Sequence, residues 1–262
     1  MMAVFGIVPV AAPLIGGLAL ALRGWPAVFW VFGAIALALL AAVGFGLRET
    51  APAARPSIAP ARVAASYASL FGDMRFRAAL ATMLLAQMGV IAFVSSSALA
   101  MVQALGLTPT AFSVLFAVVM LGQICGAVIG SRLVPRLGIA RMVRLGAGCA
   151  LAGGTLLAAL ALARAPHWSA VVLPMVLYLF GCSFIIPNAT AAALSPFPQM
   201  AGAASSLLGA LPFGIGALVS AALAAAFDGT TRPMALAIAL FGGAAFLAER
   251  LWFSKTAHAA NG

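Results

Sequence analysis

The sequence predicts an all-α protein that crosses a membrane many times, and composition is the first reason. Of its 262 residues, 65% are hydrophobic and 7% are charged, whereas a soluble domain is about half apolar and roughly a quarter charged. The second reason is run length, because a helix needs about 20 apolar residues to cross the hydrocarbon core. Eight runs fit: residues 2–22, 26–47, 78–102, 110–131, 145–163, 168–187, 200–227 and 233–253. We therefore expect about eight transmembrane helices.

The first run begins almost at Met1, and we interpret it as a retained span. A secretory signal opens with basic residues before its apolar core, and residues 1–5 carry none. Residues 9–17 read "PVAAPLIGG", with two prolines and a glycine pair. Prolines are tolerated in a membrane helix where neighbouring helices satisfy the freed carbonyls, and glycines let another backbone approach closely.

The net charge of +10 could favour nucleic acid, since a basic surface attracts phosphate. The positions of the charges argue otherwise. If the first run travels outward, eleven basic residues lie inward, and the outward loops hold only three, Arg23, Arg164 and Arg232. Such asymmetry follows the positive-inside rule. We expect no nucleic-acid partner, a location in the inner (plasma) membrane, and both termini in the cytoplasm.

The long polar interruption at residues 48–76 predicts a boundary between two groups of spans. Within it, five apolar or aromatic residues recur at helical spacing: Val63, Tyr67, Leu70, Phe71 and Met74. This spacing favours a short helix on the inner membrane surface, and a solvated linker is the alternative. We expect three parts: residues 1–47, a cytoplasmic linker over 48–76, and residues 77–262.

The first and seventh runs resemble each other. Aligning residues 10–17 with 209–216 matches Pro13 to Pro212 and Gly17 to Gly216. These segments stand six spans apart. A repeat at that offset is typical of a transporter built from two parallel six-helix halves.

Three stretches resemble the major facilitator superfamily, and within it the Bcr/CflA (bicyclomycin-resistance) type of drug efflux transporter. They are "APLIGG" (12–17), "SSSALAMVQALGLTPTAFSVLFA" (95–117) and "PNATAAALSPFPQMAGAASSLLG" (187–209). The resemblance covers essentially the whole chain, but only from the family's fifth helix onward. It implies a major-facilitator-type helix bundle whose N-terminal half is incomplete, with two helices of that half followed by a complete six-helix C-terminal half.

The resemblance also implies a function, namely efflux of hydrophobic drug-like molecules by alternating access, in exchange for protons. In that family the proton-coupling acid belongs to the first four helices, so we expect the coupling residue outside this chain and little transport by this chain in isolation. We expect the complete transporter to act as a monomer on a small-molecule substrate in the lipid bilayer. The alternative is an inactive or regulatory membrane fragment that only packs with other helices.

Polar side chains inside spans are the default candidates for a substrate path. The polar candidates, together with Phe213 as an apolar residue of the cavity wall, are Gln87, Ser95, Ser96, Ser97, Gln123, Tyr178, Ser183, Ser205 and Ser206. For each serine the alternative is a hydrogen bond to its own backbone or a neighbouring helix. We expect Gly122, Gly126 and Gly130, at four-residue spacing, to form one face for close helix packing.

A second group of residues is expected to gate or pack. The resemblance assigns packing of the two halves to Pro13, Gly16 and Gly17, and Pro212 is their repeat. Arg136 and Gly138 match the superfamily's cytoplasmic gating signature, although Pro135 stands where the acid would be, so membrane anchoring is favoured over a latch. We expect Asn188, at the inner end of its run, to cap or gate.

Enzyme functions find little support in the sequence. A P-loop needs Gly-Lys, and the only lysine, Lys255, follows Ser254. The two histidines form no zinc motif, and no nucleophile elbow occurs. Cys125, Cys149 and Cys182 lie in different runs without metal or redox spacing. We expect no catalytic residues, no metal site and no cofactor, and an integral-membrane enzyme is the least favoured alternative.

Overall fold

A computed structural model describes residues 24–46, 60–164 and 167–253. All regular structure in these ranges is helical. The chain forms two compact units, residues 1–62 and 63–262, each described by itself. The helices are α2 (Trp25–Gly46), α3 (Pro60–Gly72), α4 (Met74–Ala98), η1 (Leu99–Ala104), α5 (Pro109–Leu162), α6 (Ser169–Leu194), η2 (Pro198–Met200), α7 (Ala201–Ala225), α8 (Arg232–Ala248) and η3 (Glu249–Phe253).

Helix α2 matches the predicted span 26–47. It follows Gly24, whose φ of 73° lies in the left-handed region where glycine is favoured, and Pro26 occupies its first turn, where the missing N–H costs nothing. Its 22 residues include no charged side chain. A helix that is apolar on every side is suited to hydrocarbon.

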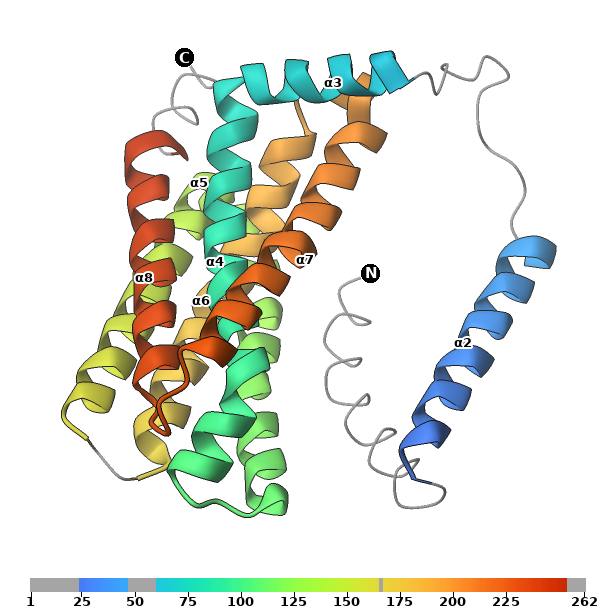
Figure 1. The fold of residues 1–262 in the computed structure, drawn as a ribbon. Helices are drawn as coiled ribbons and strands as arrows, with labels where there is room; N and C mark the ends of the chain where they lie inside the picture. The colour runs from blue at the N-terminus through green and yellow to red at the C-terminus, as the bar shows by residue number, and fades with distance from the viewer. Residues whose placement is uncertain (1–23, 47–59, 165–166, 254–262) are drawn as a thin grey trace. The chain divides into compact units, whose positions relative to one another are not determined.

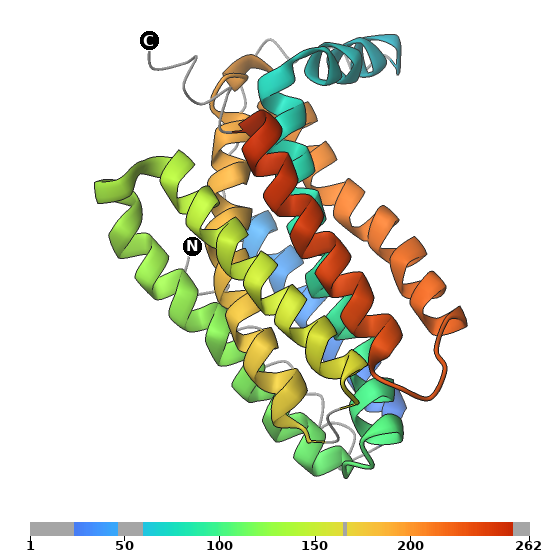
Figure 2. The ribbon, with the colours of Figure 1, turned by 90° about the vertical axis from the view of Figure 1, so that its left-hand side faces the viewer.

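Six helices in the described ranges are long and apolar enough to cross a membrane. One of them, α5, has 54 residues and contains two predicted spans, 110–131 and 145–163. Gly138 lies between the spans with φ 76° and ψ 163°, outside the helical region. Figure 2 shows the two arms of α5 running antiparallel on either side of this turn. The predicted polytopic, all-helical fold is confirmed, and the first predicted run lies outside the described residues.

The predicted short helix of the polar segment is present as α3. Figure 1 shows it lying across the end of the bundle at which α4 begins. Leu70 is fully buried, and the Phe71 and Phe76 rings meet edge to face with centroids 6.3 Å apart. Asp73 then caps α4, since its carboxylate accepts hydrogen bonds from the backbone N–H groups of Arg75 and Phe76 at 2.6 and 3.2 Å.

Helix α6 packs against both arms of α5 through glycines. A Cβ at Gly122 would lie 2.6 Å from the Val176 carbonyl oxygen, and one at Gly126 would lie 2.8 Å from that of Phe180. A Cβ at Gly130 would lie 3.1 Å from the Phe184 ring. The predicted close-packing face is therefore observed. On the second arm, Gly146 meets Gly181 backbone to backbone, because a Cβ on either would lie 2.5 Å from the other's carbonyl oxygen.

The α5–α6 contact predicts the effect of one added methyl group. Gly181→Ala should lower the free energy of unfolding by about 1–3 kcal/mol, because neither backbone can move away without unpacking the helices. Gly148→Ala on the same arm is the control, since no heavy atom lies within 4 Å of its Cβ. Denaturant unfolding in detergent micelles measures both variants. Equal stability of the two would contradict the described packing.

Candidate functional site

The candidate site is built mainly on α4 and α7. Gly216 lets the two helices approach, since a Cβ there would lie 2.5 Å from the Ile91 side chain. Pro212 is buried inside α7, one turn before Gly216. Its ring removes the hydrogen bond that would reach the carbonyl of Leu208. Phe213, next to this break, is 79% exposed.

The polar candidates on α4 differ in what satisfies them. Ser95 and Ser96 both donate to the carbonyl oxygen of Ala92, one turn earlier. The Ser97 hydroxyl is buried, and the described part of the chain offers it no hydrogen-bond partner. Gln87 is partly buried, and no hydrogen bond of its amide is recorded within the described residues. Ser97 and Gln87 therefore keep hydrogen-bonding capacity.

The candidates on α6 are committed to the packing between helices. Tyr178 is fully buried, and its hydroxyl donates to the carbonyl oxygen of Ala86 at 3.3 Å. Ser183 donates to the carbonyl oxygen of Phe180 at 2.6 Å, and its Oγ would overlap a Cβ on Gly126 of α5. Gln123, on the first arm of α5, is partly buried.

The serines of α7 lie at the end of the bundle that α3 crosses. Ser205 and Ser206 are exposed. Ser206 Oγ lies 2.9 Å from the Tyr67 hydroxyl and donates to the Ala203 carbonyl at 2.8 Å. Ser206 thus ties α3 to α7, a contact that the spacing of polar residues in the sequence does not reveal.

The expected gating residues occupy different surroundings. Arg136 is exposed beside the Gly138 turn, and Asn188 donates through Nδ2 to the Phe184 carbonyl of its own helix at 2.7 Å. Pro13, Gly16 and Gly17 lie outside the described residues.

Glu249, which is a buried acid, was not identified from the sequence. Its side chain is fully buried at the junction of α8 and η3. Its Oε1 lies 3.4 Å from Arg144 Nε, and its Oε2 lies 3.7 Å from Arg250 Nε. The signal in the sequence is one acid among several arginines at the same end of the spans.

No group of three or more metal-binding side chains occurs within the described ranges. Cys125 and Cys149 are free thiols on the two arms of α5, and Cys182 is a free thiol on α6. Cys182 donates weakly to the Ala86 carbonyl at 3.7 Å, which is a packing contact.

Comparison with known proteins gives the family. The model of the Major Facilitator Superfamily matches residues 1–221. The chain belongs to this superfamily. It is 33% identical over 224 residues to Multidrug resistance protein D of Escherichia coli K12, and that match covers 83% of the chain and 54% of the relative. It is 28% identical over 235 residues to a Bicyclomycin resistance protein homolog of Haemophilus influenzae, covering 88% of the chain and 58% of the relative.

These matches confirm the predicted Bcr/CflA-type resemblance. An Uncharacterized MFS-type transporter of Bacillus subtilis, YdgK, is 26% identical over 84% of the chain and 55% of its own length. The chain thus spans about half the length of the curated relatives it matches. Membership of the major facilitator superfamily places this multi-pass membrane protein among transporters and not among enzymes.

The Glu249 ion pairs predict a measurable coupling in this superfamily member. Glu249→Ala and Arg144→Ala should each destabilise the fold, and the double variant should show a coupling of about 1–3 kcal/mol, as for a hydrogen bond between charged groups. A control cycle combines Glu249→Ala with Arg141→Ala in place of Arg144→Ala. Arg141 is exposed and makes no ion pair within the described residues. Unfolding free energies in micelles give both cycles. Equal coupling in the two cycles would contradict the pair.

Proposed function

We propose that this chain forms part of an inner-membrane exporter of hydrophobic, drug-like molecules that works by alternating access. The observation that carries the proposal is its similarity to Multidrug resistance protein D over 83% of the chain. The second relative named for drug resistance supports the same substrate class. The proposed division of the sequence is residues 1–47, a cytoplasmic linker over 48–76, and a transport half over 77–262.

The proposed substrate wall is the face shared by α4 and α7. Gln87, which is partly buried, supplies an amide without a recorded partner, and Phe213 supplies an exposed ring. Further candidates are Ser95 and the buried Ser97 on α4, Ser205 on α7, and Gln123 on the neighbouring α5. We give Tyr178 and Ser183 a packing role, because the Tyr178 hydroxyl donates to the Ala86 carbonyl of α4 and Ser183 packs against Gly126 of α5.

The proposed orientation places the end of the bundle that α3 crosses in the cytoplasm. Within residues 63–253, that end carries seven arginines and the opposite end carries two, Arg164 and Arg232. The cytoplasmic set is Arg75, Arg77, Arg132, Arg136, Arg141, Arg144 and Arg250. This asymmetry supports cytoplasmic termini by the positive-inside rule.

Proton exchange, in this proposal, depends on an acid outside the described residues. Asp73 caps α4, Asp228 accepts hydrogen bonds from Thr230 in a loop, and Glu249 is paired with two arginines. A proton carrier must change its charge inside the membrane, and each of these acids has a structural partner.

The export proposal predicts a difference between two proteins. The 262-residue chain alone should export little ethidium, because its described helices supply one wall of a site between two halves. The same chain joined to the unmatched part of the Escherichia coli relative should give efflux that a protonophore abolishes. Fluorescence efflux from cells lacking related exporters measures both. Efflux that persists without a proton gradient would contradict the proposal of proton exchange. The absence of efflux from a correctly inserted fusion would contradict the proposal of drug export.

The substrate wall predicts a change of profile in that fusion. Gln87→Ala should shift resistance among drugs by several-fold while leaving membrane insertion unchanged, because the amide is positioned to bind polar groups of a substrate. Gln199→Ala is the control, since Gln199 is exposed in the η2 turn. Growth inhibition across a panel of neutral and weakly polar drugs measures the profile. A panel unchanged by Gln87→Ala would exclude this residue from the wall.

A further inference from the structure

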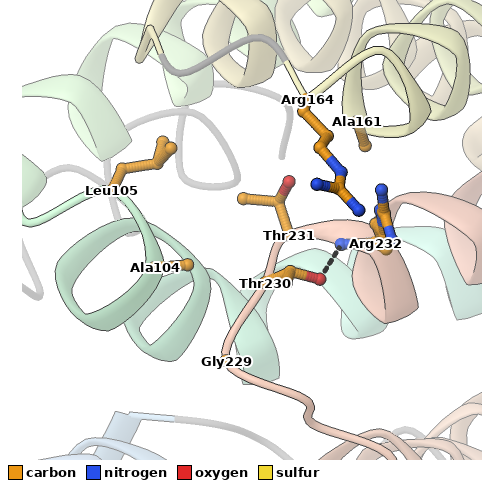
Figure 3. A pocket seen from close by; sticks show the side chains of 8 residues that line it. All are labelled: Ala104, Leu105, Ala161, Arg164, Gly229, Thr230, Thr231 and Arg232. Atoms are coloured by element: carbon orange, nitrogen blue, oxygen red, sulfur yellow. Dashed lines mark hydrogen bonds between the residues drawn. The ribbon is translucent and has the colours of Figure 1, made fainter.

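A cavity of about 510 Å³ opens at the end of the bundle opposite α3. Three connections form it: the end of η1, the end of α5, and the loop between α7 and α8. Figure 3 shows the side chains around it. The lining residues are Ala104, Leu105, Ala161, Arg164, Gly229, Thr230, Thr231 and Arg232.

Two guanidinium groups face this cavity. In Figure 3, Arg164 extends from the end of α5 toward Arg232 at the start of α8, with Thr231 beside them. Neither arginine has a carboxylate within 4 Å among the described residues, where the recorded ion pairs all involve Glu249. Like charges that converge repel each other. An anion between them would relieve that repulsion.

The backbone at both arginines is held by hydrogen bonds. Arg164 has φ 56°, a left-handed conformation that usually belongs to glycine after a helix, and its N–H donates to the Ala161 carbonyl at 3.2 Å. The Arg232 N–H donates to Thr230 Oγ1 at 3.2 Å. Both guanidinium groups are therefore carried on turns that are tied by hydrogen bonds.

Asp228, four residues before Arg232 in the sequence, is hydrogen-bonded to Thr230. Asp228 accepts from the Thr230 N–H at 3.0 Å and from the Thr230 hydroxyl at 2.6 Å. The pKa of the Asp228 carboxyl is lowered mainly by the hydrogen bond from the Thr230 side chain, with a smaller contribution from the charge of Arg232. Asp228 is thus ionised at neutral pH, yet it is not among the residues that line the cavity.

We propose that this cavity, built by Arg164, Arg232 and Thr231, binds a phosphate-bearing anion. Guanidinium groups bind phosphate through paired, charge-assisted hydrogen bonds. Apolar Leu105 and Ala161 line the same cavity, so a phosphate attached to an apolar body also fits the chemistry. The shared ligand chemistry is the phosphate, whether it is free or part of a lipid headgroup. This inference stands apart from drug export.

The test measures binding to the full chain in neutral detergent. The probes are inorganic phosphate and short-chain phosphatidylglycerol, with binding followed by native mass spectrometry and by the thermal unfolding midpoint. R164Q and R232Q should each weaken binding about tenfold or more, as expected for the loss of a charge-assisted hydrogen bond. R132Q is the control, because Arg132 is exposed at the other end of the bundle and should leave binding unchanged.

The relative affinity of the two probes tells which kind of phosphate the cavity binds. Tighter binding of phosphatidylglycerol than of inorganic phosphate assigns the site to lipid, and the reverse assigns it to a free anion. R164K should retain part of the affinity, since it keeps the charge and loses the planar fork, and it also checks for a folding defect. Binding that is absent for both probes, unchanged in R164Q and R232Q, or weakened equally in R132Q would overturn the proposal.

Discussion

The second unit depends on close approach of helix backbones, because hydrocarbon gives no hydrophobic drive for helices to associate. Packing must then come from surfaces that fit at van der Waals distance. The glycines of α5 supply such surfaces along both arms, and α6 lies against them with carbonyl oxygens where Cβ atoms would otherwise stand. Tyr178 extends this contact, since a Cβ on Gly89 of α4 would overlap its hydroxyl. Helix α4 packs against α6, and α8 packs against α4 and α5.

The hydrocarbon of the membrane also explains why polar side chains in the helices find hydrogen-bond partners within the protein. Thr82 and Thr155 donate to carbonyls one turn earlier at 2.8 Å, as Ser96 does, so these hydroxyls are satisfied without a partner helix. Glu249 is the one acidic side chain that is buried among the described residues, and it forms ion pairs with two arginines. A buried charge without such partners would be costly. The Ser97 hydroxyl differs from these, because it is buried without a hydrogen-bond partner among the described residues.

The sequence was sufficient for the spans because membrane thickness sets their length. The run at 168–187 corresponds to α6 at Ser169–Leu194, and similar agreement holds for α2. Family membership also followed from short motifs. The rotation of each helix was not predictable, because runs that are apolar on all sides do not show which face turns inward. Polarity alone therefore made Tyr178 and Ser183 substrate candidates, and it did not reveal that Tyr178 is bonded to α4 and that Ser183 packs against α5.

Contacts between distant segments were also beyond sequence reasoning. Glu249 meets Arg144 across 105 positions of the chain, and the cavity beside Arg164 needs three separate connections to come together. The helix-capping role of Asp73 and the place of Pro26 in the first turn of α2 are different, because both depend only on residues nearby in the sequence.

The crossing of α7 over α4 has a mechanical consequence. Gly216 is held against Ile91, whereas Pro212, one turn away, removes a hydrogen bond from the helix. Helix α7 is therefore easier to bend at Pro212 than at Gly216, where it packs against α4. Bending at Pro212 would move the segment that carries Ser205 and Ser206, while the segment after Gly216 would stay packed against α4.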